Sequence, residues 1–311
     1  MFSRVLGKVA DSQRLKHVVE TAPVSRSVVR RFVAGDREDD AIAVTRELAG
    51  TGLLVTLDHL GEDTLDVQQA AATAEAYVSV LHRLATEGLA SATEVSVKLS
   101  SVGQVLSIAG DGHKIALEHA MRICAAAKDA GTTVTFDMED HTTTDSTLEI
   151  VRTVRRDFPW AGVAVQSYLR RTEGDCRDLL ASGSRVRLVK GAYAEPESVA
   201  YQSRRDVDRA YVRCLKLLMA GDGYPMVATH DPRLVEIAGS LAVQTGRDPS
   251  SYEFQLLYGV RPEEQRRLAD RGEQVRIYVP YGVQWYGYLM RRMAERPANA
   301  MVFLRSLTTK R

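Results

Sequence analysis

The stretch Arg185-Val186-Arg187-Leu188-Val189-Lys190-Gly191 indicates the fold class, because it is a short β-type run that ends in a charged side chain and a glycine. Alternate residues of a strand point to opposite faces. Val186 and Leu188 therefore form an apolar face, whereas Arg185 and Arg187 form a charged one. A strand of this kind needs an apolar layer on one side and polar partners on the other.

Seven further runs share this character and alternate with longer helical patterns. The predicted strands are Leu53–Leu57, Glu94–Leu99, Thr132–Met138, Gly162–Ser167, Arg185–Lys190, Tyr224–Thr229, Ser251–Leu257 and Gln274–Val279. Between them lie amphipathic or Ala-rich segments such as Asp66–Glu87, His113–Ala130 and Glu197–Ala220. Eight βα units in about 250 residues favour a closed parallel barrel over an open doubly wound sheet. We therefore predict an α/β protein, with a (β/α)8 TIM-type barrel in residues 53–311 and an N-terminal helical arm in residues 1–52 that includes a helix at Glu38–Ala49.

The predicted strands are apolar on one face and polar on the other. The apolar set is Val95, Val97, Leu99, Val134, Phe136, Met138, Val186, Leu188, Val275, Ile277 and Val279. The polar set, expected to point inward, is Thr56, Asp58, Ser96, Lys98, Thr135, Asp137, Gln166, Arg185, Arg187, His230, Glu253, Gln255, Arg276 and Tyr278. Barrel interiors are ordinarily filled by branched apolar side chains, and active sites lie at the carboxyl ends of the strands. The pattern predicts a polar ligand in the mouth of the barrel; a self-contained ion-pair network is the alternative.

Composition excludes several classes of function. Lys plus Arg number 41 and Asp plus Glu number 40, so the net charge of +1 gives no electrostatic footprint for nucleic acid. Three widely spaced cysteines are typical of reduced thiols in a cytosolic protein. No apolar run reaches the ~20 residues that a membrane span needs. Phe2, Val5, Leu6 and Val9 share one face of a predicted helix, which we expect to pack on the body of the protein; peripheral membrane contact is the alternative.

Two lysines at strand ends are candidates for chemistry. Lys98 ends the second predicted strand and Asp137 ends the third, so we expect them to pair across the barrel mouth and to hold each other charged. A purely structural salt bridge would give the same pattern. A lysine in this position also fits a Schiff-base aldolase or lyase, with Lys98 or Lys190 as the nucleophile.

Two loop motifs indicate a possible anion site but are weak alone. Lys190-Gly191-Ala192-Tyr193 allows close approach of the backbone to a phosphate or a ring, yet it matches neither a P-loop nor a dinucleotide fingerprint. In Thr229-His230-Asp231-Pro232, Asp231 is the predicted N-cap of a helix whose N-terminus could bind an anion. His230 alone is more often a hydrogen-bonded structural histidine. No group of residues has the spacing of a metal site that we would predict.

The last helix, near Val283–Glu295, presents a row of polar side chains. Tyr288, Arg291, Arg292 and Glu295 fall at i, i+3, i+4 and i+7, on one face. Two adjacent guanidiniums suit a carboxylate, which arginine grips with two hydrogen bonds. An Arg-Arg pair is usually a solvated surface feature, but its position just after a polar strand favours a binding role.

In this order and at these strand ends, the motifs resemble the proline dehydrogenase (proline oxidase) family, of the monofunctional bacterial type, from about Leu53 to Arg296. The motifs are Leu57-Asp58-His59-Leu60-Gly61-Glu62, Ser96-Val97-Lys98-Leu99-Ser100, Phe136-Asp137-Met138-Glu139, Val165-Gln166-Ser167-Tyr168, Arg187-Leu188-Val189-Lys190-Gly191-Ala192-Tyr193, Ala228-Thr229-His230, Phe254-Gln255-Leu256-Leu257-Tyr258-Gly259, Arg276-Ile277-Tyr278-Val279-Pro280-Tyr281-Gly282 and Tyr288-Leu289-Met290-Arg291-Arg292-Met293-Ala294-Glu295. The resemblance implies a distorted barrel that binds FAD non-covalently at its mouth, with the final helix lying over it.

The resemblance also implies a reaction. L-Proline would be oxidised to Δ1-pyrroline-5-carboxylate by hydride transfer to flavin N5, and the electrons would pass to a membrane quinone. The product would go to a separate pyrroline-5-carboxylate dehydrogenase. A cytoplasmic location follows, with a peripheral position on the inner face of the membrane as the alternative.

The family's functional residues carry over to matching positions. Arg291, Arg292 and Lys98 would hold the substrate carboxylate. Asp137, Arg187 and Tyr278 would be the catalytic residues, with Asp137 balancing the cations and Arg187 donating toward flavin N5. Tyr278, Tyr288, Leu257 and Tyr193 would shape the ring pocket. The remaining contacts to FAD would come from Met138, Gln166, Lys190, Gly191, Ala192, Thr229, His230 and Gln255. Glu62 would be a gate that pairs with Arg291, and Ala194 stands where some members have tryptophan.

Overall fold

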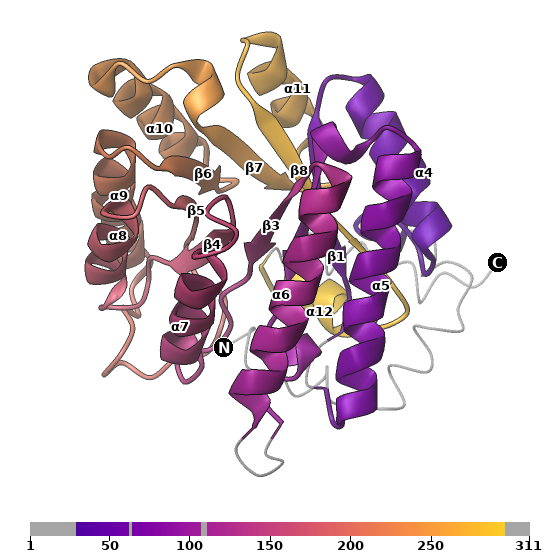
Figure 1. Cartoon of the computed structure of the whole chain (residues 1–311). Coiled ribbons are helices and arrows are strands. Elements are labelled where there is room, and N and C mark those ends of the chain that lie inside the picture. The colour runs from indigo at the N-terminus through magenta and orange to yellow at the C-terminus, as the bar shows by residue number, and fades with distance from the viewer. Residues whose placement is uncertain (1–28, 62–63, 107–110, 296–311) are drawn as a thin grey trace, which may run out of the picture.

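Eight parallel strands close into a barrel in chain order, as the sequence predicts (Figure 1). The computed structural model describes residues 29–61, 64–106 and 111–295, with the backbone alone for 291–295. The strands are β1 (Leu54–His59), β2 (Thr93–Val97), β3 (Thr133–Phe136), β4 (Gly162–Gln166), β5 (Arg185–Val189), β6 (Tyr224–Ala228), β7 (Glu253–Leu257) and β8 (Val275–Tyr281). Pairing of β1 with β8 closes the ring.

Helices surround the barrel. They are α4 (Glu38–Gly50), α5 (Val67–Thr86), α6 (Gly112–Ala130), α7 (Thr144–Val154), α8 (Thr172–Leu180), α9 (Arg204–Ala220), α10 (Pro232–Thr245), α11 (Pro262–Asp270) and α12 (Trp285–Glu295). Short 3-10 turns lie at Ala90–Ala92, Ser100–Val102 and Pro249–Ser251. Helix α4 contacts β1 and β8 and lies beside α5, to which Arg83 joins it by ion pairs with Glu38 and Asp39 (Figure 1). None of the helices in the described ranges is long and apolar enough to cross a membrane.

Element boundaries depart from the sequence prediction mainly at one helix. The helix predicted from Glu197 begins at Arg204, because the Ser203 hydroxyl caps it by accepting from the Asp206 amide. The preceding residues form a loop in which Ala200 makes an antiparallel bridge with Leu169. The first strand also extends to His59, where it pairs with Tyr281.

The predicted facing of the strands is confirmed. Every residue of the apolar set lies in the main hydrophobic core, between the barrel and its helices. Arg187 on β5 bonds to Ser96 on β2 and to Gln255 on β7, two strands that are not its neighbours, so its side chain must cross the lumen. The three cysteines are buried and free, as the sequence predicts.

Residues 29–35 form a seat for the last helix. Val29, Phe32, Val33 and Leu60 form a second apolar cluster with Tyr286, Tyr288, Leu289 and Met290 of α12. The Ala34 amide donates to the Pro280 carbonyl, and the Gly282 amide donates to the Gly35 carbonyl. The Phe2–Val9 helix lies outside the described residues.

Gly259 allows the closest approach of this seat to the barrel. Its φ is +70°, and a Cβ there would lie 1.7 Å from the Arg31 carbonyl oxygen. We expect Gly259→Ala to lower the free energy of unfolding by about 2 kcal/mol or more, because both the backbone conformation and the contact forbid a side chain. Gly239→Ala, within α10 and with no atom within 4 Å of its Cβ, should instead stabilise by about 0.5–1 kcal/mol. Chemical unfolding of both variants checks this; equal effects would contradict it.

Candidate functional site

Lys98 lies at the mouth of the barrel between two carboxylates. Its ammonium is 2.7 Å from both oxygens of Asp58 and 3.8 Å from the nearer oxygen of Asp137. Lys98 and Asp137 do meet, but the closer partner is Asp58 and not Asp137. Asp58 lies in the last part of β1, directly beside β2, so its short side chain reaches the lysine first.

Tyr278 and Arg187 complete this group on the other side of Asp137. The Tyr278 hydroxyl donates to one oxygen of Asp137 at 2.8 Å, and Arg187 donates to the other at 2.6 Å. The guanidinium carbon of Arg187 lies 5.3 Å from the centre of the Tyr278 ring. Burial, followed by the charge of Asp137, raises the pKa of Tyr278 well above its ordinary value. Tyr278 is therefore a neutral hydrogen-bond donor that orients the carboxylate.

Below this group, buried charges span the barrel around Glu94. The Glu94 carboxylate is fully buried and accepts from Arg187 at 2.9 Å and from Arg185 at 3.2 Å. Arg276 lies 3.9 Å from it and donates to Glu253 at 2.8 Å. The four bases Lys98, Arg185, Arg187 and Arg276 thus match the four acids Asp58, Glu94, Asp137 and Glu253. The ion-pair network considered as an alternative does exist, as a floor beneath the mouth.

Glu94 stays ionised in this floor. Its burial opposes ionisation, but the charges of Arg276, Arg185 and Arg187 outweigh burial and lower the pKa of Glu94 from 4.5 to about 2. Hydrogen bonds from the Thr56 and Thr135 hydroxyls complete its coordination. The arginines are held in one geometry by a fixed negative charge at their centre.

Two buried side chains of the barrel, Arg187 and Gln166, keep hydrogen-bonding groups that bond to no described residue. Arginine has five N–H donors; among the described residues, Arg187 uses four, on Gln255, Ser96, Asp137 and Glu94. Gln166 donates one amide N–H to the Glu139 carbonyl, and no other bond joins its side-chain amide to a described residue. Arg187 therefore keeps one N–H, on the nitrogen that bonds to Glu94, and Gln166 keeps the rest of its amide group.

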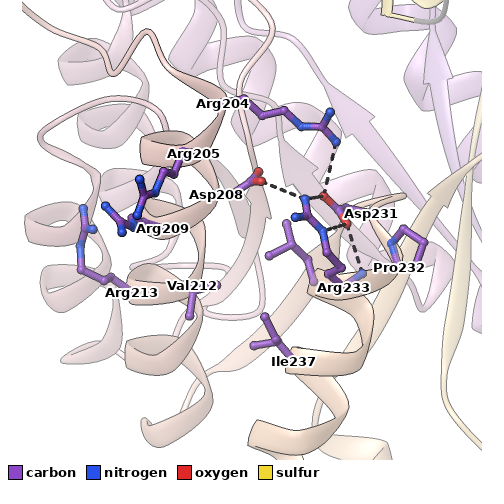
Figure 2. Close-up of a pocket in the computed structure, with 11 residues that line it drawn as sticks. Arg204, Arg205, Asp208, Arg209, Val212, Arg213, Asp231, Pro232, Arg233 and Ile237 are labelled. Carbon is purple, nitrogen blue, oxygen red and sulfur yellow. Dashed lines mark hydrogen bonds and ion pairs between the residues drawn. The ribbon is translucent and has the colours of Figure 1, made fainter.

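A basic hollow of about 1100 Å³ lies beside the mouth, between α9 and α10. Figure 2 shows Arg204 and Arg233 directed toward Asp231, the residue that caps α10 as predicted, and Asp208 directed toward Arg233. Lys190, at the end of β5, donates to Asp208 at 2.6 Å and to Asp231 at 3.2 Å, which links the hollow to the barrel. Arg233 and, less strongly, Lys190 lower the pKa of Asp231 despite its burial.

His230 joins two strand ends. The Leu257 amide donates to Nε2 of His230 at 3.0 Å, so this nitrogen is an acceptor and the ring is held as a structural link between β6 and β7. The Thr229 hydroxyl accepts from the Asp231 amide at 3.2 Å. Both predicted cofactor residues therefore shape the turn that starts α10.

The other predicted residues lie apart from one another. Gln255 lies within the network, where it bonds to Arg187 and Glu253. Tyr193 packs on the Tyr168, Leu169 and Ala200 cluster, and Tyr288 lies in the cluster that seats α12. Met138 is buried at the end of β3, Gly191 has a φ of +110° and Ala192 is exposed. Glu62 and the side chains of Arg291 and Arg292 lie outside the described part of the chain.

Among the charged residues of the network, the predicted inward set includes Asp58 but omits Glu94. Asp58 is one of the alternate residues of β1 that point into the barrel. Glu94 alternates with Ser96 and Lys98 on β2 and therefore points to the same side as they do. This alternation is the sequence signal that places both carboxylates in the barrel interior. It shows which face a residue occupies but not which arginine or lysine crosses the lumen to meet it.

Comparison with known proteins identifies relatives along most of the chain. A family model described as proline dehydrogenase matches residues 41–305. The chain is 38% identical to Proline dehydrogenase 1 of Bacillus subtilis (strain 168) over 286 residues, which is 92% of each chain. It is 39% identical to Proline dehydrogenase of Deinococcus radiodurans over 276 residues, or 88% of each.

Solved structures share the fold. The proline utilization A (PutA) protein of Bdellovibrio bacteriovorus inactivated by N-propargylglycine superposes with a TM-score of 0.78 at 24% identity. The match covers 86% of this chain and 32% of that one, so the chain spans about a third of the larger protein. PutA of Bradyrhizobium japonicum, as the D778Y mutant, gives a TM-score of 0.72 at 22% identity.

We expect Glu94→Gln to destabilise the protein at neutral pH but not in acid. Because the pKa of Glu94 is lowered on folding, its stabilisation is present above pH 4.5 and is lost as the pH falls toward 2. The variant should be less stable by about 3 kcal/mol at pH 7, and the difference should shrink below pH ~4.5. Chemical unfolding at several pH values measures it. Glu149→Gln, at an exposed position on α7, is the control; a Glu94 difference that is constant with pH would contradict the assignment.

Proposed function

The chain belongs to the proline dehydrogenase family, and from this premise we propose that it oxidises L-proline to Δ1-pyrroline-5-carboxylate with FAD as the hydride acceptor. The observation that carries the proposal is the convergence of Lys98, Asp137, Arg187 and Tyr278 at one barrel mouth. This arrangement gives a small zwitterion a cation, an anion and a phenol within a few ångströms.

The groups left over at the mouth fit an isoalloxazine ring. The ring carries carbonyl and ring-nitrogen acceptors and one N–H donor, which match the unused N–H of Arg187 and the side-chain amide of Gln166. Reduced flavin gathers negative charge, and Arg187 is a permanent cation held in place by Glu94, Asp137 and Gln255. Bound FAD supplies the redox chemistry, and the protein supplies position and field.

The diphosphate and adenosine portions of FAD require a cationic surface beside the ring. Lys190, Gly191, Ala192 and the turn at Thr229–His230 lie between the mouth and the basic hollow of Figure 2. The hollow is lined by guanidiniums together with Val212, Leu234 and Ile237, a combination suited to phosphates joined to a planar base. We assign this region, with Met138, to the rest of the cofactor.

Charge balance explains how the mouth receives proline. Lys98 meets two carboxylates in the described structure, so it alone would not attract another anion. Arg291 and Arg292 add two positive charges on the final helix, one turn beyond the buried Tyr288. The four bases and four acids of the network already balance, so the two arginines leave two positive charges, and the substrate carboxylate would neutralise one of them. Glu62 would pair with Arg291 when the site closes.

Removal of hydride from the carbon next to nitrogen requires a neutral amine, because its lone pair stabilises the developing iminium. Asp137, oriented by Tyr278 and Arg187, is the charged group available beside that iminium. Tyr278, Tyr288, Leu257 and Tyr193 would surround the ring and exclude water. Preorganised charge of this kind favours the transition state without reorganisation at the moment of reaction.

Electrons from the reduced flavin would pass to a membrane quinone, and the pyrroline product to a separate dehydrogenase. A cytoplasmic protein that contacts the inner face of the membrane would meet both needs. Family membership supports these partners.

A Schiff-base aldolase or lyase is the second candidate, since two lysines lie at strand ends. Such a lysine has to be neutral to attack a carbonyl. Lys98 lies between Asp58 and Asp137, and Lys190 lies between Asp208 and Asp231. Each lysine is held in ion pairs with two carboxylates, so the contacts favour the flavoenzyme.

The flavin assignment predicts a yellow protein that bleaches when proline is added without air. Absorbance near the flavin bands, followed during anaerobic titration, measures the reduction. A colourless protein that borohydride traps with a carbonyl compound would instead support the lyase.

If Arg291 and Arg292 hold the substrate carboxylate, their loss should change KM for proline without changing the binding of FAD. Arg291→Ala or Arg292→Ala should raise KM for proline at least tenfold, about 1.4 kcal/mol each, because a charge-assisted contact to the substrate is lost. FAD content should not change. Arg266→Ala, at an exposed position on α11, is the matched control. An unchanged KM in both helix variants would remove the clamp.

A further inference from the structure

Loops that follow β4 and β5 are joined along their backbones at one side of the mouth. The Tyr168 amide donates to the Lys190 carbonyl at 2.9 Å, and the Tyr201 amide donates to the Tyr168 carbonyl at 2.8 Å. The Tyr168 ring lies on Gly191 so closely that a Cβ there would be 2.2 Å from the ring. The segment from Lys190 to Tyr201 is therefore anchored at both ends to the loop after β4, which Arg170 also joins to the Glu197 carbonyl at 3.1 Å; the loop after β3 needs an attachment of its own.

Glu195 provides that attachment, to the loop that follows β3. One of its carboxylate oxygens accepts from the His141 amide at 2.9 Å and from the Tyr168 hydroxyl at 3.5 Å. The other bonds to Nδ1 of His141. The Gln202 side chain donates to the Glu195 carbonyl at 3.1 Å, which folds the segment back on itself. Glu195 thus joins the loops after β3, β4 and β5.

The Glu195 contacts are strong because its carboxylate is withdrawn from water. Its side chain is only 4% exposed, whereas that of His141 is 32% exposed. A buried carboxylate has to keep its hydrogen bonds, and removal of one partner costs more than a surface pair contributes. The flanking Ala194 and Pro196 are exposed, so neither anchors the segment by burial. Ala194 also lacks the large side chain that some family members carry here.

We propose that Glu195, fastened by His141, is the positioning residue that fixes the Lys190–Tyr193 segment for the phosphate-bearing part of FAD. The inference rests on the proposed flavin function. Glu195 acts through the loop: it sets the conformation of Gly191, whose φ of +110° only glycine adopts readily, and the direction of Lys190 beside it. Loss of the fastening lets the segment sample other conformations, and FAD then has to order it on binding.

Affinity for FAD tests the proposal. With apoprotein titrated by FAD and followed by flavin fluorescence, Glu195→Ala should raise the Kd at least tenfold. At saturating FAD, KM for proline should change less than twofold. Glu197→Ala, two residues further along the same loop and exposed, is the matched control and should bind like the unmodified protein. His141→Phe, which leaves Glu195 in place, should weaken FAD binding in the same direction and covers the case in which Glu195→Ala does not fold.

Backbone amide hydrogen exchange of the apoprotein separates this inference from the proposed function. Amides of residues 190–200 should exchange faster in Glu195→Ala and His141→Phe than in Glu197→Ala. Unchanged exchange, or an FAD Kd equal to that of Glu197→Ala, overturns the positioning role while leaving a flavoenzyme. If the unmodified protein binds no FAD, the proposed function is overturned, and so is the proposed role of Glu195 in FAD binding.

Discussion

The Glu94–Arg187 ion pair, buried in the lumen, is the contact on which the rest of the site depends. Arg187 reaches from β5 to partners on β2 and β7 and to Asp137 at the end of β3, so one side chain fixes the spacing of four parts of the barrel. Most barrels fill this volume with aliphatic side chains. Here four acids and four bases replace them, and a buried pair of this kind is costly to break on one side only, about 3–5 kcal/mol. The positions of the charged groups in the floor of the mouth are consequently fixed.

Within this cluster, one set of charged residues stabilises the barrel and another set faces the mouth. Arg185, Arg276, Glu94 and Glu253 pair with one another and form the floor. Toward the mouth, Lys98, Asp137 and Tyr278 form a second layer, which Arg187 joins to the floor by its bond to Asp137. A ligand that enters therefore meets groups whose positions are already determined by the layer below. Binding does not have to order them, which is the condition for efficient electrostatic stabilisation.

The sequence predicted the barrel, the facing of its strands and the convergence of Lys98, Asp137 and Arg187, because strand periodicity and strand ends are local properties. It did not predict that Asp58 is the nearer partner of Lys98, since that depends on how side chains from adjacent strands share the lumen. Glu94 was missed for the same reason. The late start of α9 and the Glu195–His141 contact follow from a loop conformation that periodicity does not describe. Arg291, Arg292 and Glu62 stay predictions.

The outer layer determines what the final helix packs against. Because α4 contacts β1 and β8 from outside, the side of the barrel where the ring closes is covered by a helix that precedes the first strand. Helix α12 is then not needed there and packs instead on Leu60, beyond the end of β1, and on residues 29–33. The segment before β1 therefore makes two contributions. Helix α4 covers the outside of the barrel, and residues 29–33 pack against α12, the helix that contains Arg291 and Arg292. A change in that seat would shift α12 relative to the barrel, so under the proposed carboxylate clamp the position of the arginine pair would depend on apolar contacts far from the charges.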